Sequence, residues 1–214
     1  MTGPIVVVAG GMVPEASVRA RLGDPELVIA ADSGVDHVRV LGLLPDVVVG
    51  DLDSVSADGL AWATSAGATV HRHPVDKDRT DLELALDLAE AAADGRRTQV
   101  IVVDAGGGRF DHLIGNLTLL AVPRGELEIT AFIGNATVTV IRDRRSIRGR
   151  PGELVSLFAL GAPATGVTTD GLRWALADAT LTPGTSLGIS NEFVGTDATV
   201  SAHTGTVMAI QPGA

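Results

Sequence analysis

The chain has 214 residues, of which 45% are hydrophobic and 20% charged, and its formal net charge is −10. This composition excludes a disordered chain, and no uninterrupted apolar run reaches the roughly 18 residues that suggest a membrane span. The negative charge argues against broad binding to nucleic acids or anionic membranes, and the absence of cysteine excludes disulfides and thiolate chemistry. The N-terminus shows no basic region followed by an apolar signal core. We therefore expect a soluble, cytoplasmic protein that binds neither nucleic acid nor membrane.

Four apolar runs in the first half of the chain predict buried strands. They cover residues 5–9, 27–31, 47–49 and 99–103. Helix-sized segments lie between them, including 14–22 and 34–41, and this alternation predicts right-handed βαβ units and a parallel sheet. Ligands of such sheets bind beyond the carboxyl ends of the strands. The absence of a GxGxxG fingerprint weighs against a nicotinamide enzyme.

The third predicted strand ends at Gly50 and runs directly into two acidic residues. If the chain stays extended there, Asp51 and Asp53 project to the same side, because side-chain direction alternates along a strand. Two neighbouring carboxylates repel unless one is protonated or a cation neutralises them, and Mg²⁺ would suit this arrangement. The alternative is an acidic turn in which Asp53 or Ser54 caps a short helix. These residues alone leave both interpretations open.

A mixed-charge loop over residues 76–78 precedes the clearest helix of the sequence. Thr80 and Glu83 have the spacing of a capping box, and the helix is expected to stop near Gly95. Asp81 lies in the first turn, where the helix macrodipole favours negative charge, so a structural role would explain it. That role does not explain the loop before it, which could hold both metal and phosphate.

The fourth predicted strand opens into a glycine-rich stretch, residues 105–108, followed by Arg109 and a second apolar helix. Consecutive glycines let backbone N–H groups converge on an anion, and the helix directs its positive end the same way. Arg109 adds a forked cation. Asp111 could instead be only the N-cap of this helix, and His112 a partly buried helix residue.

The character of the sequence changes near residue 125. Short β-rich segments separated by Gly, Pro and Asp turns follow, without a convincing helix. We expect a Rossmann-like parallel α/β domain over 1–124 and an antiparallel β-sandwich over 125–214. Asp170-Gly171 predicts a two-residue hairpin turn.

Five motifs carry a resemblance to the thiamine pyrophosphokinase (thiamine diphosphokinase) family, and the match runs from Asp32 nearly to the C-terminus. They are Ala31-Asp32-Ser33-Gly34; Gly50-Asp51-Leu52-Asp53-Ser54; Asp76-Lys77-Asp78 with Thr80-Asp81 and Glu83; Gly107-Gly108-Arg109-Phe110-Asp111-His112 with Asn116; and Thr169-Asp170-Gly171-Leu172-Arg173-Trp174 followed by Gly188-Ile189-Ser190-Asn191-Glu192. Each motif alone is weak, but all five in order are highly specific. Leu52 stands where the family often has Phe, and Ser33 where Gly is frequent; neither change removes a candidate ligand.

The resemblance implies a catalytic domain that binds Mg-ATP, a thiamine-binding β-sandwich, and a homodimer with its active sites at the subunit interface. It also implies a kinase of the transferase class that acts in thiamine diphosphate biosynthesis. Such an enzyme moves a diphosphoryl group from ATP to the hydroxyethyl oxygen of thiamine, giving thiamine diphosphate and AMP.

In-line attack on phosphorus needs positioning and charge neutralisation more than covalent help. We therefore expect carboxylates to hold Mg²⁺ and basic or backbone groups to bind the phosphates. The expected metal ligands are Asp51, Asp53 and Asp81, with Asp78 as an alternative fourth. The expected ATP contacts are Asp32, Lys77, Gly107, Gly108 and Arg109. Asp111 could bind metal through water, contact thiamine or cap its helix, and no residue is assigned as general base.

Thiamine is expected to contact the second half of the chain. Trp174 offers an aromatic face to a cationic heterocycle, and Ser190 and Asn191 offer hydrogen bonds to an aminopyrimidine. The alternative for Trp174 is core packing. Two other functions compete: a diphosphokinase that acts on a pterin alcohol, and a non-catalytic thiamine or nucleotide sensor. The Trp174 and Ser190-Asn191 match argues against the first, and the presence of every metal candidate argues against the second.

Overall fold

The computed structural model describes residues 3–104 and 109–213. The chain divides into two compact units. The first contains the residues up to 113 together with 124–134, and the second contains 114–123 together with the residues from 135 onward. Among the described residues, no helix is long and apolar enough to cross a membrane.

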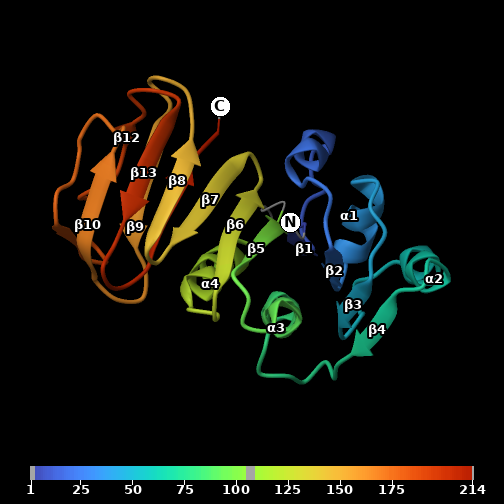
Figure 1. Cartoon of the computed structure of the whole chain (residues 1–214). Coiled ribbons are helices and arrows are strands. Elements are labelled where there is room, and N and C mark those ends of the chain that lie inside the picture. Colours follow the sequence, from blue (N-terminus) through green and yellow to red (C-terminus); the bar gives the residue numbers. More distant parts are fainter. Residues whose placement is uncertain (1–2, 105–108, 214) are drawn as a thin grey trace. The chain divides into compact units, whose positions relative to one another are not determined.

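The first unit is built on a parallel sheet with the strand order β6-β5-β1-β2-β3-β4 (Figure 1). The strands are β1 (Ile5–Val8), β2 (Leu27–Ala31), β3 (Val47–Gly50), β4 (Thr69–Arg72), β5 (Thr98–Asp104) and β6 (Leu127–Ile133). Every residue of β1 is buried, which explains its uninterrupted apolar sequence. The predicted parallel α/β fold is confirmed.

Helical segments connect these strands. They are the 3₁₀ segment η1 (Ala16–Arg21) and the helices α1 (Gly34–Val40), α2 (Ala57–Ser65), α3 (Asp81–Ala93) and α4 (Phe110–Ala121). The helix expected over 14–22 is therefore a short 3₁₀ turn. Neither α2 nor β4 is predicted by the sequence pattern, since all residues of β4 are exposed and α2 buries only two small residues, Gly59 and Ala63.

The boundary expected at 124/125 differs from the division in the structure. Strand β6 pairs in parallel with β5 along its whole length, from Leu127 beside Thr98 to Ile133 beside Asp104. The segment that looked like the first β-sandwich strand is therefore part of the first unit. Its β-rich sequence could not distinguish a parallel partner from an antiparallel one.

The second unit contains two antiparallel sheets with the orders β12-β9-β14-β7 and β11-β10-β13-β8. Their strands are β7 (Ala136–Ile141), β8 (Arg144–Arg148), β9 (Leu154–Ala159), β10 (Ala164–Asp170), β11 (Ala179–Leu181), β12 (Asn191–Glu192), β13 (Asp197–Ser201) and β14 (Val207–Gln211). Buried residues of both sheets, among them Leu157 of β9 and Val200 of β13, form one hydrophobic cluster. The predicted antiparallel sandwich is confirmed.

The hairpin predicted at Asp170-Gly171 is wrong. Strand β10 ends at Asp170, but its neighbours are β11 and β13, and Leu172 instead bridges to Phe193. Gly171 does make the turn, with φ +79, and a Cβ there would lie 2.4 Å from the backbone oxygen of Asp197. The turn therefore directs the chain first toward β12, and pairing with β10 resumes only at β11.

Candidate active site

The carboxyl ends of β2 and β3 present acidic residues at one edge of the parallel sheet. Asp32 follows β2, and Asp51 follows Gly50 at the end of β3. Two residues there, Asp32 (φ 46) and Leu52 (φ 64), adopt the left-handed conformation that non-glycine residues rarely take. Strained backbone at two adjacent strand tips is typical of a functional site.

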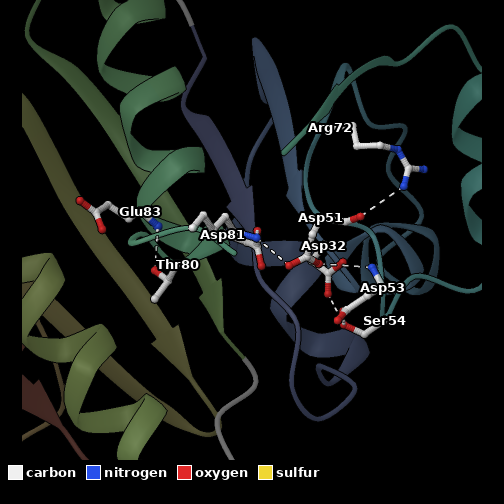
Figure 2. Close-up of polar contacts among 9 residues, drawn as sticks. Asp32, Asp51, Asp53, Ser54, Arg72, Thr80, Asp81 and Glu83 are labelled. Carbon is white, nitrogen blue, oxygen red and sulfur yellow. Dashed lines mark hydrogen bonds and ion pairs between the residues drawn. The ribbon is translucent and has the colours of Figure 1, made fainter. Parts of the chain in front are cut away.

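Asp32, Asp51 and Asp53 converge, and each offers a carboxylate oxygen within 4.8 Å of the others (Figure 2). Of the two conformations left open for this segment, the chain does not stay extended. The chain turns at Leu52, and the backbone N–H of Asp53 donates to Asp51 Oδ1 at 3.3 Å. The turn therefore brings the two carboxylates together. Asp32, expected to contact ATP, joins them because β2 and β3 are neighbours in the sheet.

The donor set of this group fits a hard cation. Asp32 is buried, and its Oδ1 has no hydrogen-bond partner among the described residues. Ser54 Oγ bonds to the other oxygen of Asp32 and lies 3.2 Å from Asp53 Oδ1. A buried carboxylate oxygen without a donor is costly unless a cation satisfies it, and carboxylate oxygens are the ligands that Mg²⁺ prefers.

Lys77 connects this group to the start of α3. Its Nζ lies 2.7 Å from Asp51 Oδ2 and 3.0 Å from Asp81 Oδ1. The hydrogen bond from Lys77 lowers the pKa of Asp51, whereas burial raises the pKa of Asp81. Thr80 caps α3 through the N–H of Glu83, which accounts for the placement of Asp81 in the first turn (Figure 2). The capping box predicted for this helix is thus half formed, from the Thr80 side.

Gly50 allows these groups to approach each other closely. Its φ is +148, and a Cβ at this position would lie 2.9 Å from Asp81 Oδ1 and 3.2 Å from Asp32 Cβ. Any side chain would therefore push the two acids away from the strand tip. The carboxylate of Asp81 accordingly lies beside the group, although it is not among the three mutually close acids.

Arg72 is a candidate anion contact that the sequence analysis missed. It ends β4, opposite Gly50 in the register, and its guanidinium donates to the backbone oxygen of Asp51 at 3.3 Å (Figure 2). The register of an exposed edge strand cannot be deduced from its residues, so no sequence signal distinguished Arg72. Asp78, the alternative fourth ligand, is exposed and lies outside the carboxylate group.

Arg109 and Asp111 form an exposed bidentate pair at the start of α4. Arg109 Nε lies 3.1 Å from Asp111 Oδ1, and its NH2 nitrogen lies 2.5 Å from Oδ2. The hydrogen bond from Arg109 lowers the pKa of Asp111 to about 2. Asp111 lies within the first turn of α4 and is not its N-cap. Gly107 and Gly108 lie outside the described residues.

In the second unit, Asn191 fixes the position of Trp174. Asn191 is buried; its Oδ1 accepts from the N–H of Trp174 at 3.0 Å, and its Nδ2 donates to the Trp174 oxygen at 2.8 Å. Trp174 is 52% exposed, so it is not part of the core, and the guanidinium carbon of Arg173 lies 4.9 Å from the centroid of its ring. Ser190 is exposed and left-handed, with φ 57. Asn191 thus fixes the backbone of Trp174, and most of its side-chain hydrogen-bonding groups are bonded to the backbone.

Two family models match the chain in tandem. The thiamin pyrophosphokinase catalytic domain matches residues 19–131, and the thiamin pyrophosphokinase vitamin B1 binding domain matches residues 139–207. The chain belongs to the thiamine pyrophosphokinase family. The resemblance that the five motifs indicated is confirmed.

Named relatives and solved structures agree with this assignment. The chain is 32% identical over 179 residues to thiamine pyrophosphokinase 3 of Oryza sativa subsp. japonica, which covers 79% of this chain and 65% of the rice protein. It is 26% identical to the thiamine pyrophosphokinase of Bacillus subtilis over 97% of both chains. The crystal structure of a B. subtilis thiamine pyrophosphokinase superposes with a TM-score of 0.81 at 25% identity, covering 99% of each chain. The chain spans 58% to 66% of the length of the first plant relatives of this family.

Proposed function

We propose that this chain is a thiamine diphosphokinase that transfers a diphosphoryl group from Mg-ATP to the hydroxyethyl oxygen of thiamine. The observation that carries the proposal is the convergence of Asp32, Asp51, Asp53 and Lys77 beyond the carboxyl ends of the parallel strands. The chain that contains this group matches both family models. A set of carboxylates beside an ammonium group is what a metal–polyphosphate complex requires.

Asp51, Asp53 and Asp32 would hold Mg²⁺, with Asp81 beside them. A bound Mg²⁺ would neutralise the charge of the ATP phosphates during transfer. Lys77 and Arg109 are proposed as phosphate contacts, and Arg72 joins them because its guanidinium lies at the same strand tip. Arg109 must exchange its pairing with Asp111 for a phosphate, since both of its bonded nitrogens contact that carboxylate.

The proposed step forms one bond and breaks one. The hydroxyethyl oxygen of thiamine attacks the β-phosphorus of ATP, and the bond from that phosphorus to the oxygen bridging it to the α-phosphorus breaks. AMP leaves with that oxygen, and the hydroxyl proton is released. The chain contributes positioning and positive charge, and no residue is assigned as the base.

For thiamine, Trp174 is proposed as the aromatic face that stacks on the cationic ring, with Ser190 as a hydrogen-bonding neighbour. The exposure of Trp174 and the fixation of its backbone by Asn191 support this role. We also propose a cytoplasmic homodimer in which the thiamine-binding half of one subunit completes the site of the other. The resemblance to the family supports that assembly, and self-complementary two-fold packing allows it.

Product identification tests the proposal. The protein is incubated with ATP, Mg²⁺ and either thiamine or a pterin alcohol, and the products are identified by mass spectrometry. We expect AMP and thiamine diphosphate, with no product in EDTA. ADP with thiamine monophosphate, or turnover only with the pterin alcohol, would show that the assignment is wrong. Thiamine binding without any turnover would identify a sensor.

A further inference from the structure

Arg79 lies between the lysine of the candidate site and the body of α3. Its Nε is 3.3 Å from Glu83 Oε1, and its NH2 nitrogen pairs with Asp87. Among the described contacts of residues 74–79, side-chain bonds come from Lys77 and Arg79, and the backbone contributes the bond from Lys77 N–H to the Val75 oxygen at 2.9 Å. Lys77 itself reaches the first turn of α3 through Asp81, and Arg79 attaches this loop to α3 farther along the helix, at Glu83 and Asp87.

Asp87 is itself held from the opposite side. Its other carboxylate oxygen accepts from the NH1 nitrogen of Arg124, whose side chain is only 7% exposed. The next carboxylate, Glu90, is 3.8 Å from the same nitrogen. Because a nearly buried guanidinium needs a close counter-ion, Arg124 fixes Asp87 more firmly than an exposed ion pair would. Asp87 thus offers Arg79 a rigid anchor.

We propose that Arg79 is a positioning residue that holds the Lys77 loop against α3, with Asp87 and Arg124 as its anchor. This inference rests on the proposed function, in which Lys77 binds ATP phosphate. Lys77 and Arg79 flank one exposed residue, Asp78, so attaching Arg79 restricts where the Lys77 backbone can lie. A loop that is already held in place loses less conformational entropy when nucleotide binds.

Arg79→Met should weaken ATP binding more than it slows chemistry. The side chains of Arg79, Glu83 and Asp87 are partly exposed, and partly exposed ion pairs stabilise a structure only modestly. We therefore expect KM for ATP to rise about threefold to tenfold, with KM for thiamine unchanged and kcat within about twofold. Arg79→Lys should recover part of the effect, because an ammonium group can still reach one of the two carboxylates.

Arg97→Met is the matched control. Arg97 pairs with the carboxylate of Glu128 at 2.5 Å and is, like Arg79, partly exposed, but it precedes β5 and so lies at the opposite end of the parallel strands. The Arg97→Met substitution removes the same charge as Arg79→Met and breaks a comparable ion pair. We expect its KM values to match those of the wild type.

Hydrogen exchange of the substrate-free protein provides the readout that does not depend on activity. In a peptide spanning residues 75–84, the amides of Lys77 and Glu83 are bonded to Val75 and Thr80. Arg79→Met should exchange faster than wild type in this peptide, and Arg97→Met should not. Unchanged exchange in Arg79→Met, or an equal rise in KM for both variants, would overturn the positioning role. A wild-type protein without kinase activity would refute the proposed function, while the exchange comparison would still decide how the loop is held.

Discussion

Asp51 lies beside both the lysine and the other carboxylates of the candidate site. Its carboxylate accepts from Lys77, and it lies in one group with the carboxylates of Asp32 and Asp53. A carboxamide is nearly isosteric but lacks the charge that would hold a divalent cation. Asp51→Asn and Asp53→Asn should therefore each lower kcat about 100-fold or more while leaving the circular dichroism spectrum unchanged. Steady-state assays at saturating Mg²⁺ measure this effect.

Asp58→Asn is the control for those substitutions, because Asp58 is exposed in the first turn of α2 and outside the carboxylate group. Its activity should stay near that of wild type. If Asp51→Asn or Asp53→Asn behaved like this control, the corresponding carboxylate would be structural, and the role proposed for it would be wrong.

Lys77 gives the protein a pH-dependent contribution to stability. Its hydrogen bond lowers the folded-state pKa of Asp51 below the ordinary 3.8, so this stabilisation is complete above that value and is lost as pH falls through the lowered pKa. In EDTA, Lys77→Met should lower the free energy of unfolding near pH 7 by about 1 kcal/mol. The difference from wild type should shrink below pH 3.8. Urea unfolding across a pH series measures it, and a difference that grew on acidification would contradict the assigned pair.

At the scale of elements, the start of α3 places Asp81 at the site. Thr80 Oγ1 accepts from the N–H of Glu83 at 3.2 Å, and loss of such a cap costs about 1 kcal/mol. Thr80→Ala should therefore lower the free energy of unfolding by about 1 kcal/mol. Urea denaturation measures the change, and fraying of the first turn should also weaken ATP binding.

Thr64→Ala is the matched control, since Thr64 lies in the last turn of α2 and its hydroxyl donates to the oxygen of Leu60, one turn earlier. This substitution should change the free energy of unfolding by no more than about 0.5 kcal/mol. Equal losses for both variants would mean that the cap at Thr80 does not carry the stability of α3.

The sequence predicts those elements whose burial leaves a hydrophobic pattern, either an uninterrupted apolar run or a helical period. Strand β1 is buried throughout, and α3 has both a cap and an apolar face, so both could be identified from residue types. Strand β4 is exposed throughout and leaves no such pattern. The residues of β6 predict a strand but not its partner, because the parallel pairing with β5 depends on contacts outside the strand itself.

The residues of the candidate site also divide into those that the sequence predicts and those whose contacts depend on tertiary structure. The acids at the tips of β2 and β3 could be predicted because parallel strands end at one edge, but their exact grouping depends on the left-handed turn at Leu52, a leucine that no propensity places there. Residue chemistry alone points Asn191 toward the substrate, whereas its bonds to Trp174 depend on a fold that joins distant segments. Residue types therefore predict which groups are available, and tertiary structure decides what they bind.

At the scale of the whole molecule, the metal and phosphate candidates belong to the first unit, and Trp174 belongs to the second. Under the proposed homodimer, a catalytic half from one subunit and a thiamine-binding half from the other form each site. Asp51→Asn and Trp174→Ala subunits, each nearly inactive alone, should then recover partial activity when mixed and refolded together. Some mixed dimers would combine two intact halves, and steady-state assays of the mixture against each parent measure the gain.

The two parent variants should fail in different ways, which makes the mixing experiment decisive. Asp51→Asn removes charge at the metal group, whereas Trp174→Ala removes an exposed aromatic face and should mainly raise KM for thiamine, by about 5-fold to 30-fold for a stacking loss of about 1–2 kcal/mol. The mixture should therefore regain turnover at low thiamine, where neither parent works. Differently tagged subunits purified in tandem establish that exchange has occurred. Proven exchange without recovered activity would place each site within one chain, and an active monomer would show that no subunit interface is required.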